Sequence, residues 1–520
     1  MSKFHSMVSR RDFMKNLGLA GAGMIGGAAL LTAPKFHDLD EMIASQGASY
    51  KQKRPWYVKE RDLFNPTADV DWDIMNRFDR MNEGHQQHTA AYYYPTARVQ
   101  NMAAVGAAAT AQNTQSGVPG LDYKCTALRN AYTAGVTTNW VEGWTGPTGG
   151  TLAATPATLG VPQWSDTPEN NTHLLNAASR FFGAGLVGYA EVEDHWYNKL
   201  FVTYTTQGCT GTQYADHSIP YPPPASSRMQ ITYENVPVGY ATATKHVVPM
   251  SGQYLMVSAV PSAIEATQTS YSAIGKVNYL DKGFFGVSAR NATWNFLYAL
   301  GYHSLGDTGD QNDTCNHGAS TVLTGIAESS RQNNWVLTPE YGGLMSSRSQ
   351  IIDLPVVPTP PIDAGMFRFC HSCHKCADNC PAQVISYAKE PTFEVPLTDE
   401  TNAAGGATGV PQVCHNPGPK HFWTHMPGCL MYYNEHGWSC CMCNGSCTFT
   451  VNRASMIHSL VKPTIAETGV FDSFFYKMAK DFGYGLMANK DDWWDLSLPV
   501  GGIDTTRVAY DKGYQFSGKW

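Results

Sequence analysis

Residues 370–381 read Cys-His-Ser-Cys-His-Lys-Cys-Ala-Asp-Asn-Cys-Pro, and this stretch decides how the chain is organised. Its spacing, C-x2-C-x2-C-x3-C-P, is that of bacterial ferredoxins, in which three thiolates hold one 4Fe-4S cluster and the fourth cysteine holds the other. A second run follows at residues 429–447 with the spacing C-x10-C-x2-C-x3-C. The two runs together predict two interlocked clusters, and therefore a protein that moves electrons.

The ferredoxin pattern assigns each cysteine to one cluster. The first cluster is expected on Cys370, Cys373, Cys376 and Cys447. The second is expected on Cys380, Cys429, Cys440 and Cys443. Because each run contributes to both clusters, the two should lie close enough for rapid electron hopping.

Zinc sites and disulfides are the alternatives. Zinc uses one group of four ligands per ion and has no need of a third cysteine at this spacing or of the Cys-Pro ending. Cysteines only three residues apart bridge poorly. Five further cysteines fall outside the pattern and are expected to be ordinary buried thiols, although Cys441 adjoins a proposed ligand: Cys125, Cys209, Cys315, Cys414 and Cys441.

The N-terminus carries an export signal. Ser9-Arg10-Arg11-Asp12-Phe13-Met14-Lys15 precedes a weakly apolar stretch from Asn16 to Ala33, which is typical of the twin-arginine pathway. That pathway carries folded proteins and so suits a chain whose clusters are inserted inside the cell. Residues 1–48 are therefore assigned to a signal peptide and connector, with cleavage expected between Ala33 and Ala48.

Composition restricts the partners. The net charge is -7 and no basic run occurs outside the signal, so nucleic acid is not expected as a partner. With 43% hydrophobic and 12% aromatic residues the chain should fold compactly. No other stretch approaches the length of a transmembrane helix, so attachment to a membrane would depend on a partner.

An α+β core is expected before the cysteines. Apolar residues at helical intervals predict helices at 171–187 and 288–300, and strands are expected at 186–192, 199–204, 246–248 and 253–260. The Ala/Thr/Gly-rich stretch 102–161 is interpreted as long loops or short elements inserted at the surface over a more regular core, with the lining of a substrate channel as the alternative.

Proline sets the boundary of the cysteine module. Residues 353–361, Asp-Leu-Pro-Val-Val-Pro-Thr-Pro-Pro, should run extended. The expected divisions are a core at 49–360, a cluster module at 361–462, and a C-terminal segment at 463–520 that is partly helical and packs its aromatic side chains on the core.

With these features in place, the chain resembles the corrinoid- and iron-sulfur-dependent reductive dehalogenases of organohalide-respiring bacteria. Beyond the cysteines and the signal, the resemblance rests on short motifs spread over nearly the whole chain. They are Pro55-Trp56-Tyr57-Val58-Lys59, Thr167-Pro168-Glu169-Asn170-Asn171, Arg180-Phe181-Phe182-Gly183, Ala299-Leu300-Gly301-Tyr302, Glu328-x-Ser330-Arg331, Pro339-Glu340-Tyr341-Gly342, Asp353-Leu354-Pro355 and Pro361-Ile362-Asp363-Ala364-Gly365.

The resemblance implies a nitroreductase-like α+β core that binds a corrinoid in base-off form, followed by a bacterial ferredoxin-like module with two 4Fe-4S clusters. The reaction it implies is reductive cleavage of a carbon-halogen bond, with a small chlorinated or brominated aliphatic compound as the expected substrate and aromatic halides as the alternative. The partners it implies are a small integral-membrane anchor protein and upstream respiratory electron donors, at the outer face of the cytoplasmic membrane.

The family uses a tyrosine as proton donor with a basic residue beside it. By position, Tyr279 is the expected donor and Arg348 the expected cation, with Tyr271 as the alternative donor. A phenol is a weak acid at neutral pH, and a guanidinium nearby stabilises the phenolate that remains after proton transfer.

Two other functions compete with reductive dehalogenation as interpretations of the sequence. One is an exported 4Fe-4S electron-transfer subunit without a catalytic site of its own, but two clusters need under roughly 100 residues and about 300 core residues would then have no task. The other is reduction of epoxyqueuosine in transfer RNA by cytoplasmic relatives with similar cofactors, which the export signal argues against.

Overall fold

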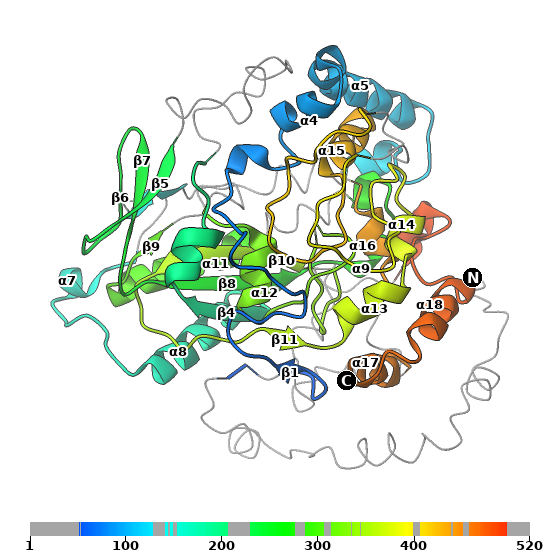
Figure 1. Ribbon diagram of the computed structural model, residues 1–520. Helices are drawn as coiled ribbons and strands as arrows, with labels where there is room; N and C mark the ends of the chain where they lie inside the picture. Colours follow the sequence, from blue (N-terminus) through cyan, green and yellow to red (C-terminus); the bar gives the residue numbers. More distant parts are fainter. Residues whose placement is uncertain are drawn as a thin grey trace.

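The computed structural model of the chain describes most residues between 51 and 496 (Figure 1). The described ranges are 51–52, 54–127, 141–143, 146–148, 153–205, 229–275, 286–305, 314–333, 335–343, 345–398, 406–437, 440–450 and 457–496. The predicted export signal, Tyr279 and Cys209 lie outside them. No helix in the described ranges combines the length and the apolar character needed to cross a membrane.

A four-stranded antiparallel sheet forms the centre of the core. Its strands, in spatial order, are β4 (Leu186–Glu191), β8 (Tyr254–Pro261), β10 (Met345–Ile352) and β9 (Ser304–Leu305). The register sets Val257 of β8 opposite Gly188 on one side and Ser349 on the other. In β8 every residue after Tyr254 is buried, because both faces of the sheet are covered.

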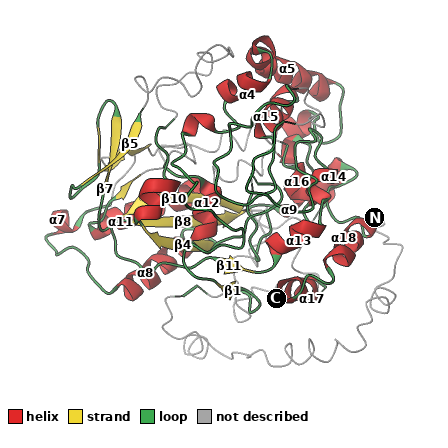
Figure 2. Cartoon of the chain, in the orientation of Figure 1, coloured by secondary structure: helices red, strands yellow, loops and turns green. Residues whose placement is uncertain are grey.

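Successive side chains along the strands of the central sheet point to its two opposite faces. Met256 and Ile352 pack with Leu175 of α8 (Pro168–Phe181) and Leu297 of α11 (Val287–Leu300). Their chain neighbours Leu255, Val257 and Ile351 pack on the opposite face with Leu323 of α12 (His317–Leu323). Since successive strand residues point to opposite faces, one continuous apolar run can fill both layers. Figure 2 shows the sheet with helices around it.

Smaller strands tie distant segments together. β1 (Lys59–Glu60) pairs antiparallel with β11 (Ile362–Asp363), which brings the start of the described chain beside the entry to the cysteine module. β5 (Gln230–Glu234) runs parallel to β7 (Lys245–Pro249), and β6 (Tyr240–Ala241) runs antiparallel to β7. β2 (Val141–Gly143) and β3 (Gly146–Thr148) form an antiparallel pair.

Short helices make up the cysteine module and its surroundings. They are α13 (Met366–Ser372), α14 (Lys375–Asp378), α15 (Met426–Glu435), α16 (Met442–Ser446), α17 (His458–Glu467) and α18 (Asp472–Asp481). α15 lies along α5 (Thr96–Gln115), and α4 (Gln87–Tyr93) completes this group. Gly106 permits the close approach, because a Cβ there would lie 1.9 Å from the carbonyl oxygen of Asn434. The remaining helices are α7 (Pro156–Leu159) and α9 (Ile264–Gln268).

The mixed α+β class is confirmed. Helices α8 and α11 confirm the helices predicted at 171–187 and 288–300, although α8 begins earlier and ends at Phe181. β4, β7 and β8 confirm three of the predicted strands. The prolines at 353–361 run without helix or strand, held by bonds from the Asn171 side chain to the Pro355 oxygen (3.0 Å) and from the Val357 amide to Thr172 (2.8 Å). In the C-terminal segment, α18 confirms the predicted helical character.

Two predictions of local structure are wrong. The strand expected at 199–204 is instead a π-helical turn, Trp196–Leu200, followed by single bridges at Phe201 and Tyr204. The turn forms because it buries Trp196, Tyr197 and Leu200 on the same side of the chain. The loops expected from residue 102 are wrong up to residue 115, where the alanine-rich α5 continues. Alanine favours a helix, but it leaves little hydrophobic periodicity to detect.

Candidate metal centre and cavity

The first cysteine run is folded as two short helices separated by a turn. Cys370 lies on α13, Cys373 follows that helix in an extended conformation, and Cys376 lies on α14. Gly365 starts α13 with a φ of 71°, and a Cβ there would lie 2.4 Å from the oxygen of Ile465. Glycine is therefore required at this entry, since other residues rarely adopt that φ.

The structure gathers the eight cysteines of the two runs into two neighbouring sets. The first cysteine set is Cys370, Cys373, Cys376 and Cys447, whose thiols lie near enough to act on one another electrostatically. The second cysteine set is Cys380, Cys429, Cys440 and Cys443, which interact in the same way and also with Cys441. Cys376 also acts on Cys443, so the two sets approach each other there. Iron ligation by these thiols stays a prediction.

Burial favours the protonated thiol at seven of these eight cysteines. Desolvation, with smaller contributions from neighbouring thiols, raises the pKa of Cys447 to about 11 and that of Cys429 to about 12. A metal ion reverses this preference, because the thiolate is the form that binds metal. Cys447 and Cys429 therefore lack the lowered pKa that is typical of reactive cysteines.

The spacing within each set is too wide for a single zinc ion. In a tetrahedral zinc site with bonds of 2.3 Å, the sulfur atoms lie about 3.8 Å apart. Among the described residues, the only group of three metal-binding side chains whose ligand atoms all lie within 4.8 Å of one another is Asp122, Cys125 and Asp491. Within both cysteine sets the sulfur atoms are spaced more widely than this limit.

The Glu328-x-Ser330-Arg331 motif fastens the cysteine module to the core. The buried Glu328 carboxylate accepts hydrogen bonds from the amides of Ala364 (3.2 Å) and Met366 (3.0 Å), at the start of α13. Burial, with a smaller contribution from the charge of Asp363, raises the pKa of Glu328 to about 7. Arg331, also buried, bonds to carbonyl oxygens of the first cysteine run.

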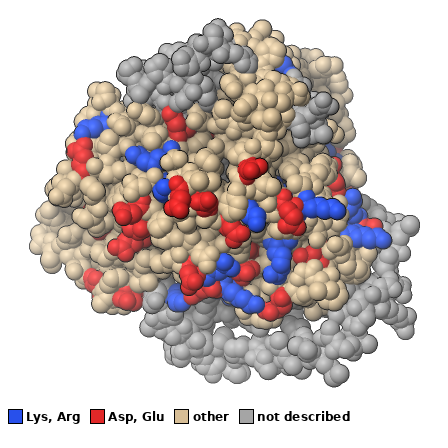
Figure 3. All heavy atoms as spheres, in the orientation of Figure 1, with Lys and Arg blue, Asp and Glu red and all other residues tan. Residues whose placement is uncertain are grey.

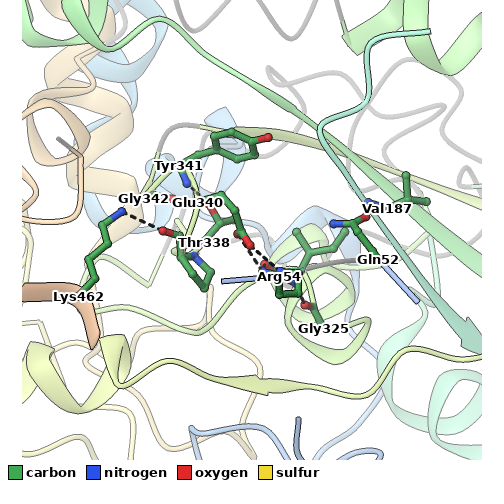
Figure 4. Close-up of polar contacts among 11 residues, drawn as sticks. Gln52, Arg54, Val187, Gly325, Thr338, Glu340, Tyr341, Gly342 and Lys462 are labelled. Carbon is green, nitrogen blue, oxygen red and sulfur yellow. Dashed lines mark hydrogen bonds and ion pairs between the residues drawn. The ribbon is translucent and has the colours of Figure 1, made fainter. Parts of the chain in front are cut away.

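The Pro339-Glu340-Tyr341-Gly342 motif makes a second attachment, shown in Figure 4. The Arg54 guanidinium binds both oxygens of the buried Glu340 carboxylate, at 2.6 and 3.0 Å, and also the Gly325 oxygen. From the other side, Lys462 of α17 donates to the oxygen of Pro339 (2.9 Å). The motif therefore joins the start of the described chain, the core and the C-terminal helices.

A cavity of about 330 Å³ lies between the core and the cysteine module. Its walls are largely neutral, and Glu83 is the one carboxylate among the described residues that line it. Hydrogen-bonding side chains are contributed by Ser262, Thr267, Asn316, Ser329, Ser347 and Asn444. Cys441 and Asn444 also line the cavity, so it reaches the chain of the second cysteine set.

Aromatic and imidazole side chains complete the walls of this cavity. Trp72 and Trp335 come from the core side, and Trp423 stands between His415 and His421, with ring centroids at 4.9 and 5.7 Å. Burial lowers the pKa of His415 to about 3 and that of His421 to about 4. Both imidazoles are therefore neutral at physiological pH and add no charge to the cavity.

Of the predicted proton-transfer residues, the structure describes Arg348 and Tyr271 but not Tyr279. Arg348 is buried on β10 opposite Ser258 and is not among the residues that line the cavity. Its neighbour Ser347 does line the cavity, so Arg348 points to the other face of the sheet. Tyr271 donates its hydroxyl proton to the backbone oxygen of His436, beyond α15.

A second buried arginine was not anticipated from the sequence. Arg290 is 5% exposed in the first turn of α11, the helix that covers the face of the sheet to which Arg348 points. An arginine on a helix is usually a surface residue, so the sequence carries no signal for its burial. The same applies to the cavity, whose walls come from segments scattered between residues 66 and 444.

Figure 3 shows one face of the surface, where acidic and basic side chains are interspersed over the core and the cysteine module. No single sign of charge dominates this face. It therefore offers no continuous basic surface of the kind that binds nucleic acid.

Comparisons with known proteins agree on one family. The model of the reductive dehalogenase subunit family matches residues 53–356. The chain is 32% identical to a chloroethene reductive dehalogenase of Dehalococcoides mccartyi strain VS, over 97% of this chain and 99% of that protein. It is 28% identical to a trichloroethene reductive dehalogenase of another strain of that organism, over 96% and 98%.

Solved structures are similar in fold. A catabolic reductive dehalogenase aligns with a TM-score of 0.55 at 15% identity, over 86% of this chain and 52% of that chain. A reductive dehalogenase studied for B12-dependent dehalogenation aligns with a TM-score of 0.53 at 16% identity, over 86% and 51%. The chain thus spans about half the length of both, and shares their mixed α+β fold.

Replacing Glu328 by Gln should remove a pH dependence of stability. The pKa of Glu328 is raised from 4.5 to about 7 on folding, so the folded wild type holds a proton that the unfolded chain releases. Wild-type stability should therefore fall as pH rises from about 4.5 to 7, by up to roughly 1.4 kcal/mol per pH unit. The Gln variant should lack this slope in thermal unfolding between pH 5 and 8.

Glu467→Gln is the matched surface control, since Glu467 is exposed. Its pH profile should run parallel to that of the wild type. If Glu328→Gln also gives a parallel profile, the buried carboxyl is not protonated on folding.

Proposed function

The chain belongs to the reductive dehalogenase family, and from this premise we propose that it removes chlorine from a small chlorinated aliphatic compound, with chloroethenes as the leading class. Two electrons and one proton replace the carbon-chlorine bond by a carbon-hydrogen bond and release chloride. Two relatives that align over nearly their full length are named for chloroethene and trichloroethene. The observation that carries the proposal is a neutral cavity whose wall includes Cys441 and Asn444, from the chain segment that carries the second cysteine set.

Two 4Fe-4S clusters are proposed as the electron path. Each cysteine set offers four thiols, buried or partly buried, at spacings wider than a single ion would use. The first cluster would be held by Cys370, Cys373, Cys376 and Cys447. The second would be held by Cys380, Cys429, Cys440 and Cys443. The approach of Cys376 to Cys443 supports electron transfer between them.

A base-off corrinoid is proposed in the cavity. Amide side chains surround a corrinoid, and the walls offer neutral partners for them, such as Ser329, Asn316 and Asn444, with almost no charge. When bound and reduced, the corrinoid supplies a strongly reducing cobalt centre. The chain's own residues exclude water with Trp72, Trp335 and Trp423, and keep the second cysteine set next to the cavity.

Tyr279 is proposed as the proton donor and Arg348 as the cation that stabilises its phenolate, with Tyr271 as the alternative donor. Arg348 is buried within the core, where a positive charge acts through a low dielectric constant. Arg290 is a second buried cation on the helix that covers the same face, and it extends the set of candidates for this role.

The proposed architecture follows the divisions expected from the sequence. Residues 49–360 form a nitroreductase-like core, 361–462 a ferredoxin-like module, and 463–520 a segment that packs on the core. Phe475 of this last segment shares one apolar cluster with Tyr57 and Leu337 of the core, and also with Phe369 and Phe449 of the module.

The proposed location is the outer face of the cytoplasmic membrane, reached through the twin-arginine signal at residues 1–48. A small integral-membrane protein would anchor the enzyme there, and respiratory proteins would supply its electrons. The alternative, an electron-transfer subunit without a catalytic site, leaves the cavity and most of the core unexplained.

The purified protein, reconstituted with iron, sulfide and a corrinoid, should release chloride from chloroethenes under a strong reductant. Chloroalkanes and chlorophenols tested alongside would define the substrate class. Protein with both clusters but without corrinoid should release none. Binding of iron and sulfide together with refusal of the corrinoid would leave only the electron-transfer function.

Tyr279→Phe should lower chloride release by roughly 10²-fold or more, the usual contribution of a positioned acid. Chloride release and cofactor content should be measured on the same sample, with Tyr271→Phe as the matched variant. Unchanged turnover of Tyr279→Phe with intact cofactors would remove Tyr279 from the mechanism. In that case, a loss of chloride release in Tyr271→Phe would assign the role of proton donor to Tyr271.

Cys443→Ala should lower the iron content from about eight to about four atoms per chain, since it removes a ligand of the second cluster. Cys441→Ala is the matched control, two residues away in the same loop, and should retain about eight. Equal iron contents in the two variants would show that the ligands are wrongly assigned.

A further inference from the structure

Arg331 is a completely buried cation beside the first cysteine set. It is 0% exposed, and its Nε donates to the carbonyl oxygens of Cys370 (3.0 Å) and Cys373 (2.8 Å). Its Nη1 donates to the oxygens of Ser386 (2.8 Å) and Ala388 (2.7 Å). The guanidinium therefore lies inside the loop that carries the first three cysteines.

No carboxylate among the described residues balances this charge by a hydrogen bond or ion pair. The acceptors of Arg331 are all neutral backbone oxygens, and the guanidinium also lies 4.0 Å from the centre of the Phe422 ring. Burial lowers the pKa of Arg331, and the thiolate forms of Cys370, Cys376 and Cys373 are the neighbouring groups that most oppose this lowering. A buried cation without an anion is costly, so its natural partner is an anionic group bound by these thiols.

The second cysteine set has a neutral counterpart in the next residue along the chain. Gln332 donates from its amide to the carbonyl oxygen of Cys443 (3.1 Å), while its backbone oxygen accepts from Thr424 (3.0 Å). For Cys429, Cys440 and Cys443 the neighbouring charges are those of other cysteines. Two adjacent residues thus contact the two sets: Arg331 brings a full positive charge to the first set, and Gln332 brings a neutral amide to the second.

We propose that Arg331 raises the reduction potential of the cluster held by the first cysteine set above that of the cluster held by the second. This inference rests on the proposed function, because it presumes that both clusters are bound. Reduction adds one negative charge to a cluster, and a buried cation stabilises that charge. The neutral amide of Gln332 stabilises the added charge of the second cluster less.

The consequence concerns the direction of electron flow. The second set is the one whose chain lines the cavity, through Cys441 and Asn444. An electron would therefore rest on the first cluster and reach the cavity side by an uphill step, in which the first cluster is oxidised and the second reduced by one electron. No proton or atom moves in that step. The first cluster acts as the store and the second as the low-potential donor.

The test is a redox titration of the holoenzyme, with each cluster followed by electron paramagnetic resonance. Arg331→Gln should shift the distribution of an electron between the clusters at least tenfold toward the second, which is 59 mV for a one-electron couple. The first cluster's potential should fall while that of the second stays constant. Arg331→Lys, which keeps the charge, should keep most of the difference. Cys443→Ala identifies which signal belongs to which cluster.

A second variant covers the case in which Arg331→Gln fails to fold. Lys375 is also buried beside the first set, and its ammonium donates to the oxygens of Ala479 and Tyr484. Lys375→Gln should lower the same potential and leave the second cluster unchanged. If neither Gln variant moves the first potential in protein that holds both clusters, the inference is wrong. Wild-type protein with fewer than about eight iron atoms would instead overturn the proposed function.

Discussion

The gathering of eight thiols, buried or partly buried, into two neighbouring sets is the constraint on which the rest of the structure depends. Such a module cannot stand alone, because each loop that carries cysteines needs polar partners for its backbone. The core supplies them through one short segment. Glu328 holds the amides at the start of α13, Arg331 holds the carbonyl groups of the first run, and Gln332 holds the carbonyl group of Cys443.

This arrangement links the electron path to the cavity. The segment 328–332, which binds the cysteine loops by hydrogen bonds, also contains Ser329 and Ser330, which line the cavity. The second cysteine set adjoins it through Cys441 and Asn444. A cofactor bound in the cavity would therefore contact the same segment, residues 328–332, that holds the loops of the proposed clusters. The ion pair between Arg54 and Glu340 joins the neighbouring part of the core to the start of the described chain.

Local patterns predicted much of the fold and little of the cavity. The cysteine spacing is a short-range signal, and so are the apolar runs of β4 and β8, which is why the sets and these two strands of the central sheet could be anticipated, whereas β9 and β10 were not. Helix α5 was missed because alanine gives propensity without periodicity, and the turn at Trp196–Leu200 because its apolar residues resemble a strand. The burial of Arg290 and the direction of Arg348 depend on tertiary packing, which no local pattern encodes.

The most direct test of the central claim is a spin measurement on the fully reduced protein. Two clusters held by interlocked sets, with Cys376 near Cys443, should be magnetically coupled. The fully reduced protein should give a split electron paramagnetic resonance spectrum that integrates to about two spins per chain. An unsplit spectrum that integrates to one spin or none in iron-replete protein would contradict it.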